Sequence, residues 1–133
     1  MGMIEEIGAY LEAAGIGTQG TDLFLNGLPP DPDAAVAIQE YGGEAPVFVH
    51  GTAGVSEERR RFQMTARAAT VAAAMSQAQA GHALLCAIRN QALGGTTWYV
   101  GIYPLQSPWP LGKDENGRAR VVCNYRVEKA VSV

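Results

Sequence analysis

The sequence predicts one α+β domain spanning residues 1–133, in which two helices flank a mainly antiparallel or mixed sheet of about five strands. Three observations support this prediction. A chain of 133 residues is long enough for one core and too short for two. Two stretches have helical character, and five others are predicted as strands, two of them from a clear alternation of apolar and polar residues. The resulting order, α-β-β-β-α-β-β, groups the strands together, which favours α+β architecture over repeated βαβ units.

Two stretches are predicted to be helical. Met3–Ala14 places apolar residues at spacings of three and four along one stripe, with glutamates on the outer side: Ile4, Ile7, Leu11 and Ala14. Ala68–Gln91 consists largely of Ala, Gln, Met and Leu, which are fair to strong helix formers, and Gly94-Gly95 is expected to end it. The many small alanines predict a close approach of this second helix to the sheet.

Three strands are expected in the first half of the chain, at Asp22–Leu25, Ala34–Tyr41 and Arg60–Arg67. The third alternates sharply between apolar and polar side chains, as a half-buried strand does. The prolines of residues 28–33 exclude helix and sheet pairing, so this segment is a stiff connector. Residues 42–57 are poor in charge and begin with glycines, and we expect a mobile loop there, partly extended around Val47–Val49.

The last third of the chain is predicted to form two strands, Trp98–Leu105 and Ala119–Val127, joined by an ordered loop over about residues 106–118. In the second strand alternate residues share one face: Val121, Cys123, Tyr125 and Val127. The loop exceeds the length of a tight hairpin, although Asn116-Gly117 predicts a turn near its tip. Long loops in compact domains tend to be functional or mobile.

Composition excludes several functions. The net charge of −3, from ten basic and thirteen acidic residues, argues against non-specific nucleic-acid binding, which requires a basic field. No window is apolar enough to span a membrane, and the N-terminus lacks the basic start of a secretory signal. Cys86 and Cys123 are far apart in sequence and are expected to be free thiols.

No motif predicts catalysis, a metal or a cofactor. The glycines of residues 15–20 match G-x-G-x-x-G formally, but they follow a helix and precede a strand, the reverse of a dinucleotide site. His82 and Cys86 are one helical turn apart and could share a metal, yet the other His and Cys residues match no zinc-binding spacing. The serines lack a nucleophile setting, so we expect no enzyme and no cofactor.

The loop at 106–118 has the composition of a protein contact. Trp109 lies between Pro108 and Pro110, which restrict the backbone around a large aromatic side chain. Charged residues follow at Lys113, Asp114, Glu115 and Arg118. A rigid aromatic residue beside charges is typical of interfaces. The alternative, that Trp109 folds back onto its own core, is equally compatible with the sequence.

Several segments together resemble one family. The C-terminal runs Leu105–Pro108, Pro110–Arg118 and Val122–Tyr125 are similar to the C-terminal signature of the minor capsid and tail-terminator family of long-tailed phages and prophages. Shorter segments along the rest of the chain agree with this resemblance: Ile4-Glu5, Tyr10-Leu11, Gly15–Thr18, Asp22–Phe24, Leu28–Asp33 and Glu40–Gly43. The resemblance covers nearly the whole chain.

The resemblance implies a non-enzymatic virion protein of the tail or neck, assembled in the host cytoplasm. Similar proteins form a ring, typically hexameric, that caps the tail tube, ends its polymerisation and joins the head connector. The implied partners are further copies of the chain, the tail tube protein and a head-completion or connector protein. DNA would only pass through the lumen, without sequence-specific binding, and no membrane is involved.

The two long non-core segments are the candidate ring interface, with these residues: Trp109, Lys113, Asp114, Glu115, Asn116, Arg118, Val47, Phe48 and Val49. Two other functions remain as alternatives. One is a head-completion or stopper protein of the neck. The other, more distant, is a small cytoplasmic ligand-binding protein that would use the glycine run.

Overall fold

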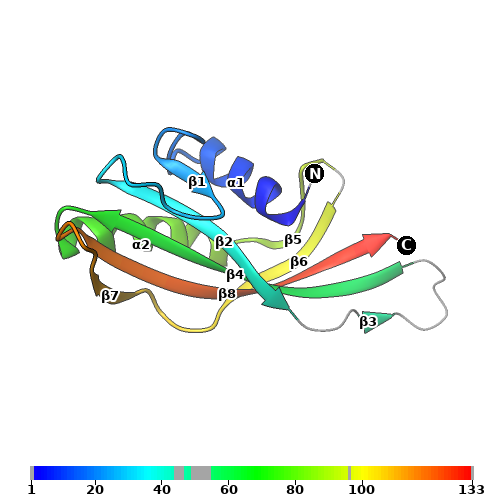
Figure 1. Cartoon of the computed structure of the whole chain (residues 1–133). Helices are drawn as coiled ribbons and strands as arrows, with labels where there is room; N and C mark the ends of the chain where they lie inside the picture. Colours follow the sequence, from blue (N-terminus) through cyan, green and yellow to red (C-terminus); the bar gives the residue numbers. More distant parts are fainter. Residues whose placement is uncertain (1, 44–46, 49–54, 96, 133) are drawn as a thin grey trace.

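The helices and the sheet form two layers in the computed structural model, which describes residues 2–43, 47–48, 55–95 and 97–132 (Figure 1). The helices are α1 (Met3–Ala13) and α2 (Val71–Cys86). The strands are β1 (Leu23–Leu25), β2 (Ala35–Gly43), β3 (Val47–Phe48), β4 (Val55–Ala68), β5 (Arg89–Leu93), β6 (Thr97–Pro104), β7 (Trp109–Lys113) and β8 (Ala119–Ser132). The predicted α+β class is confirmed, but the sheet has eight strands within these residues rather than about five.

The sheet is built around two long strands, β4 and β8. They pair antiparallel in continuous register, from Val55 opposite Ser132 to Ala68 opposite Ala119. The order across the sheet is β1-β2-β4-β8-β6-β5, with β3 added to β4 and β7 added to β8. Among the strands of the described residues only the β1–β2 pair is parallel, so the sheet is mixed, which was one of the two predicted alternatives.

The core lies between the sheet and both helices. Ile4, Ile7 and Leu11 of the apolar stripe predicted for α1 are buried, whereas Ala14 is exposed just after the helix; α2 buries its small residues Ala74, Ala78 and Gly81 against β4 and β8. A Cβ atom on Gly81 would lie 2.7 Å from Sδ of Met64, so glycine at this position allows α2 to approach β4 closely. Within the core, the rings of Phe62 and Tyr125 stack at a centroid distance of 5.0 Å.

The second helix is shorter than predicted, and the prediction for residues 87–91 was wrong. Thr70 begins α2 by accepting a hydrogen bond from the backbone N–H of Ala73 at 3.2 Å, and the helix ends at Cys86. Residues 89–93 instead form β5, because pairing with β6 outweighs their helix propensity. Gly94 and Gly95 have positive φ and form the β5–β6 turn rather than a helix end.

The expected long loop at 106–118 contains a strand, so that prediction was also wrong. Strand β6 pairs with the C-terminal half of β8, and this pairing ends where Pro104 lies opposite Tyr125. Residues 119–122 of β8 are therefore available to pair with β7. Pro110 is tolerated because β7 lies at the edge of the sheet. The Asn116-Gly117 turn is confirmed: Gly117 has positive φ and donates its N–H to the carbonyl of Asp114 at 3.0 Å.

The segment predicted as a mobile loop, 42–57, contains more paired backbone than expected. Strand β2 extends to Gly43, β3 pairs with β4, and β4 begins at Val55. The prediction for 44–46 and 49–54, which includes Val49, lies outside the described residues. The other predicted elements, α1, β1, β2, β4, β6 and β8, occur within a few residues of the predicted positions, although β4 and β8 are longer.

Candidate assembly surface

The face of the sheet opposite the helices carries a ladder of polar side chains. Because β4 and β8 pair in register, alternate residues meet as rungs on this face: Arg59–Glu128, Arg61–Arg126, Gln63–Asn124, Thr65–Val122 and Arg67–Arg120. We call the five arginines of these rungs, with the side chains between them, the arginine face. At its centre Nε2 of Gln63 donates to Oδ1 of Asn124 at 3.1 Å. Two of the five rungs place arginine directly opposite arginine.

Like charges directly opposite each other destabilise a strand pair. In the Arg67–Arg120 rung, Arg67 is nearly buried and donates from Nε to the carbonyl of Asp33 at 3.2 Å and from a terminal nitrogen to the carbonyl of Pro32 at 2.5 Å. Burial first, and then the charge of Arg118, lower the pKa of Arg67 from its usual value. Nε of Arg120 and of Arg126 is buried without a hydrogen-bond partner within the described residues.

A polar groove runs along this face. Two hollows, of about 290 and about 510 Å³, adjoin each other, because both are lined by Leu28, Arg67, Asp114 and Arg120. The floor is formed by Gln39, Gln63 and Thr65, and the walls by the proline-rich connector and the β7–β8 turn. The groove is polar and carries four basic side chains (Arg67, Lys113, Arg118 and Arg120) against two acidic ones (Asp114 and Glu115), so its excess of positive charge suits an acidic partner better than an apolar one.

Arg118 fixes one wall of this groove to the other. Its side chain is almost fully buried, and Nε donates to Oδ2 of Asp114 at 2.7 Å. A terminal nitrogen donates to the carbonyl of Pro30 and lies 3.4 Å from Oδ1 of Asp33. The β7–β8 turn and the connector are therefore held together by one guanidinium, and the predicted contact residues Asp114 and Arg118 are engaged within the chain.

Asp114 organises the turn, and this arrangement predicts a pH dependence. Burial alone would raise the pKa of Asp114, but hydrogen bonds from the backbone and guanidinium of Arg118 and from the N–H of Asn116 outweigh it and lower the pKa below its ordinary 3.8. A lowered folded-state pKa contributes stability above pH 3.8, and that stability is lost as the pH falls through the folded-state value. We expect Asp114→Asn to lower Tm at pH 7 and to match the parent protein at low pH.

Thermal unfolding of both proteins from pH 7 to pH 2.5 measures this difference. Glu115→Gln provides the matched control, because Glu115 is exposed one residue away and should give the same Tm as the parent throughout. A difference between Asp114→Asn and the parent protein that stays constant down to pH 2.5 would contradict the proposed role of this carboxylate.

Strand β7 is an exposed edge of the sheet. It pairs only with β8 within the described residues, and all five of its residues are exposed. Trp109 and Leu111 are 45% and 44% exposed, and Leu105 just before the strand is 46% exposed. Trp109 therefore lies at the surface and does not fold back onto the core. Lys113, Glu115 and Asn116 are exposed beside it.

The structure does not bring the two predicted interface segments together. Strand β7 pairs with the residues of β8 at 119–122, whereas β3, which contains Val47 and Phe48, pairs with β4 at residues 56–57. These positions lie at opposite ends of the long β4–β8 pair (Figure 1). The candidate interface of the sequence is thus two separate surfaces, and the arginine face extends between them.

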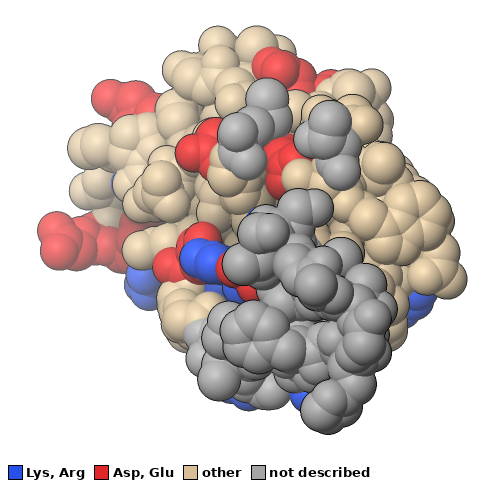
Figure 2. Space-filling view, turned by 90° about the vertical axis from the view of Figure 1, so that its right-hand side faces the viewer, with Lys and Arg blue, Asp and Glu red and all other residues tan. Residues whose placement is uncertain are grey.

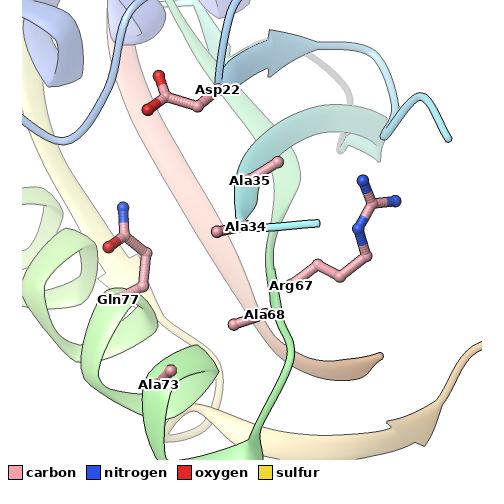
Figure 3. Close-up of a pocket in the computed structure, with 7 residues that line it drawn as sticks. All are labelled: Asp22, Ala34, Ala35, Arg67, Ala68, Ala73 and Gln77. Atoms are coloured by element: carbon pink, nitrogen blue, oxygen red, sulfur yellow. The ribbon is translucent and has the colours of Figure 1, made fainter. Parts of the chain in front are cut away.

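A smaller cavity, of about 170 Å³, lies between α2, the start of β2 and the end of β4 (Figure 3). Four alanines line it, and its amide and carboxylate groups have partners: Gln77 donates to the carbonyl of Ile16 at 3.0 Å, and Asp22 accepts the N–H of Thr18 at 2.6 Å. The guanidinium of Arg67 points away from it, towards the connector (Figure 3). The amide and the carboxylate of the cavity are therefore both engaged in contacts within the chain, and the rest of its lining is largely alanine.

His82 and both cysteines meet under α2, which the spacing in the sequence did not predict. Sγ of Cys86 and Sγ of Cys123 lie 3.6 and 3.7 Å from ring nitrogens of His82, and Oη of Tyr125 lies 2.8 Å from Nδ1. Burial lowers the pKa of His82, which favours the neutral ring in its contact with the tyrosine hydroxyl. No group of residues in the described part of the chain has the arrangement of a metal site. The thiols are not disulfide-bonded, as predicted.

The arginine face is the feature that the sequence interpretation missed. The alternation of β4 and β8 was visible, but the register that places Arg61 opposite Arg126 and Arg67 opposite Arg120 was not. Within the described residues, no helix is long and apolar enough to cross a membrane.

Comparison with known proteins gives two matches. The family described as "Bacteriophage tail terminator protein" matches residues 10–131. A chain of the solved structure "Virion of native gene transfer agent (GTA) particle" superimposes with a TM-score of 0.67 over 96% of this chain and 94% of that chain. Its sequence identity of 17% shows a shared fold alone. None of the curated protein sequences matches significantly.

Proposed function

The chain belongs to the bacteriophage tail terminator family, and from that premise we propose that it forms a ring, homohexameric as in similar proteins, that caps the tail tube, ends tube polymerisation and provides the surface for head joining. The family and the location in the virion tail are those that the sequence resemblance implied. The chain is a structural protein of the tail. The partners in this proposal are other copies of the chain, the tail tube protein and a head-completion or connector protein.

The observation that carries the proposal is the family match over residues 10–131, nearly the entire chain. The surface supports it, because an exposed edge strand bearing Trp109 and Leu111 and a charged sheet face offer two different contact surfaces on one subunit. A ring is built from heterologous contacts, in which two different surfaces of one subunit meet those of its neighbours. No catalytic arrangement was found within the described residues that would compete with this role.

Particles made without the chain test this function. We expect electron microscopy of a strain lacking only this coding sequence to show overlong tails and tails detached from heads, with infectious or transducing titre lost. Expression of the chain in trans should restore tail length and joining. Tails of normal length together with heads that have lost their DNA would instead identify a head-completion or stopper protein. Normal, joined particles would contradict both.

A further inference from the structure

The charges of this chain are divided between its two parts. Residues 1–58 contain ten acidic residues and no lysine or arginine. Residues 59–133 contain all ten basic residues and only three acids: Asp114, Glu115 and Glu128. The formal charges are therefore −10 and +7, although the whole chain carries only −3. The small net charge is therefore the sum of two large and opposite charges on the two parts of the sequence.

The fold keeps part of this division in space. Glu5 and Glu12 are exposed and seven residues apart, so both lie on the outer side of α1, although Arg60 and Lys129 line a hollow together with Glu5. In Figure 2 Asp and Glu side chains lie in the upper part of the molecule, where α1 lies in Figure 1, and meet Lys and Arg side chains at mid-height, while Lys and Arg appear lower down. The arginine face belongs to the opposite layer from α1.

Not all of the acids are available to a partner. Glu6 is buried and accepts the hydroxyl of Tyr99 at 2.9 Å, and Glu40 and Glu58 form ion pairs with Arg60. Glu5 and Glu12 remain at the surface. Glu12 makes one local contact, in which Oε2 accepts the N–H of Gln19 at 2.8 Å. The outer side of α1 is thus an acidic ridge, which we define by Glu5 and Glu12.

The arginine face is positively charged and so complements the acidic ridge, and an acidic partner would lower the repulsion between its like charges. The Arg67–Arg120 rung places two like charges directly opposite each other, an arrangement that destabilises the isolated chain. Nε of Arg120 and of Arg126 is shielded from solvent without a hydrogen-bond partner within the described residues. Carboxylates of a partner would relieve this repulsion and accept charge-assisted hydrogen bonds from the guanidinium groups.

We propose that the partner of the arginine face is a second copy of this chain, whose acidic ridge on α1 lies against it. The two surfaces are different and lie on opposite layers of the same subunit, so the contact is heterologous and propagates from subunit to subunit, as a ring requires. Charge complementarity of this kind orients subunits and suppresses face-to-face pairing of identical surfaces. The inference rests on the proposed ring function and names its contact surfaces.

A nucleic acid is the weaker candidate for this face. Polyanion binding depends on a basic field over the whole domain, and ten of the thirteen acids in this chain lie within residues 1–58 of the same small domain. The acidic ridge would repel a phosphate backbone, whereas it supplies the complementary surface for a second copy. DNA binding is therefore kept as an outcome of the test.

Charge exchange between the two surfaces tests the proposal. The first variant carries Arg120→Glu and Arg126→Glu, and the second carries Glu5→Lys and Glu12→Lys. Each places like charges at the substituted positions and those that oppose them, although Arg59, Arg61 and Arg67 remain in the first variant. Each should fail to restore normal tails in the strain lacking the chain. A third chain carries all four substitutions and restores complementarity with the signs reversed. Coexpression of the first two variants also restores complementarity at every contact of an alternating ring.

We expect the four-substitution chain and the coexpressed pair each to recover at least about a tenth of parental titre, against a loss of roughly a hundredfold or more for either variant alone. Tm values and circular dichroism spectra matching those of the parent establish that all the chains fold. Single variants that restore titre fully would overturn the inference while leaving the tail function intact. If the single variants fold but charge exchange does not rescue them, the face has another partner. Salt-dependent binding of DNA that is lost in the Arg120→Glu variant would also assign the face to another partner. Failure of the proposed function itself appears separately, as normal tails in the absence of the chain.

Discussion

Replacing Tyr125 with alanine is expected to lower the free energy of unfolding by about 3–5 kcal/mol, the range for truncation of a buried aromatic residue. The side chain is fully buried at the centre of β8. Its ring stacks on Phe62 and lies 5.7 Å from the ring of His82, and its hydroxyl is bonded to Nδ1 of His82. The substitution therefore removes contacts to β4 and to α2 together, and leaves His82 without its buried partner.

Equilibrium unfolding in urea measures this loss, and two controls separate its parts. Tyr125→Phe keeps the ring and removes only the hydroxyl, so it should be destabilised by about 1 kcal/mol. Trp98→Ala removes a larger aromatic ring from β6, but one that is 47% exposed, and should be destabilised far less than Tyr125→Ala. Equal midpoints for the parent protein and Tyr125→Ala would show that the sheet and α2 do not share one core at this position.

Local sequence patterns correctly predicted those elements whose own sequence preference matches the structure that their neighbours impose. The stripe of α1 and the alternation of β4 and β8 were visible because one side of each element is buried and the other exposed. Residues 89–93 and 109–113 were misread because their structure depends on a neighbouring strand. Strand β5 has a helix-like composition but pairs with β6, and β7 contains Pro110 but uses the free end of β8.

The functional surface was only partly predictable for the same reason. Composition singled out Trp109 and its charged neighbours as candidate contact residues. It did not predict which of these side chains are exposed and which are hydrogen-bonded within the chain. Arg118 is buried against Asp114 and the carbonyl of Pro30, a contact between residues 88 positions apart. The arginine face required the register of β4 against β8, which no local pattern encodes. The family followed from sequence resemblance, whereas the surfaces that we propose for assembly followed from pairing across the sheet.

Strand β7 provides the second large effect, which we expect on assembly and not on folding. In the double variant Trp109→Ala and Leu111→Ala, two side chains that are nearly half exposed are removed from an edge strand. Such residues contribute little to the stability of the isolated chain, and Tm should change by only a few degrees. A tryptophan buried at an interface, by contrast, commonly contributes about 2 kcal/mol or more, which corresponds to roughly thirtyfold in affinity.

Because a closed ring repeats each contact, a loss at one contact recurs around the ring, so we expect the β7 variant to fail in tail completion. The assay is rescue of the strain lacking the chain, scored by tail length and head attachment in electron micrographs. Trp98→Ala is the matched control, since Trp98 has nearly the same exposure but lies at the β5–β6 end of the sheet. Full rescue by the β7 variant would remove this strand from the interface. Equal failure of the Trp98 variant would show that loss of any exposed tryptophan is sufficient, and that the contact is not specific to β7.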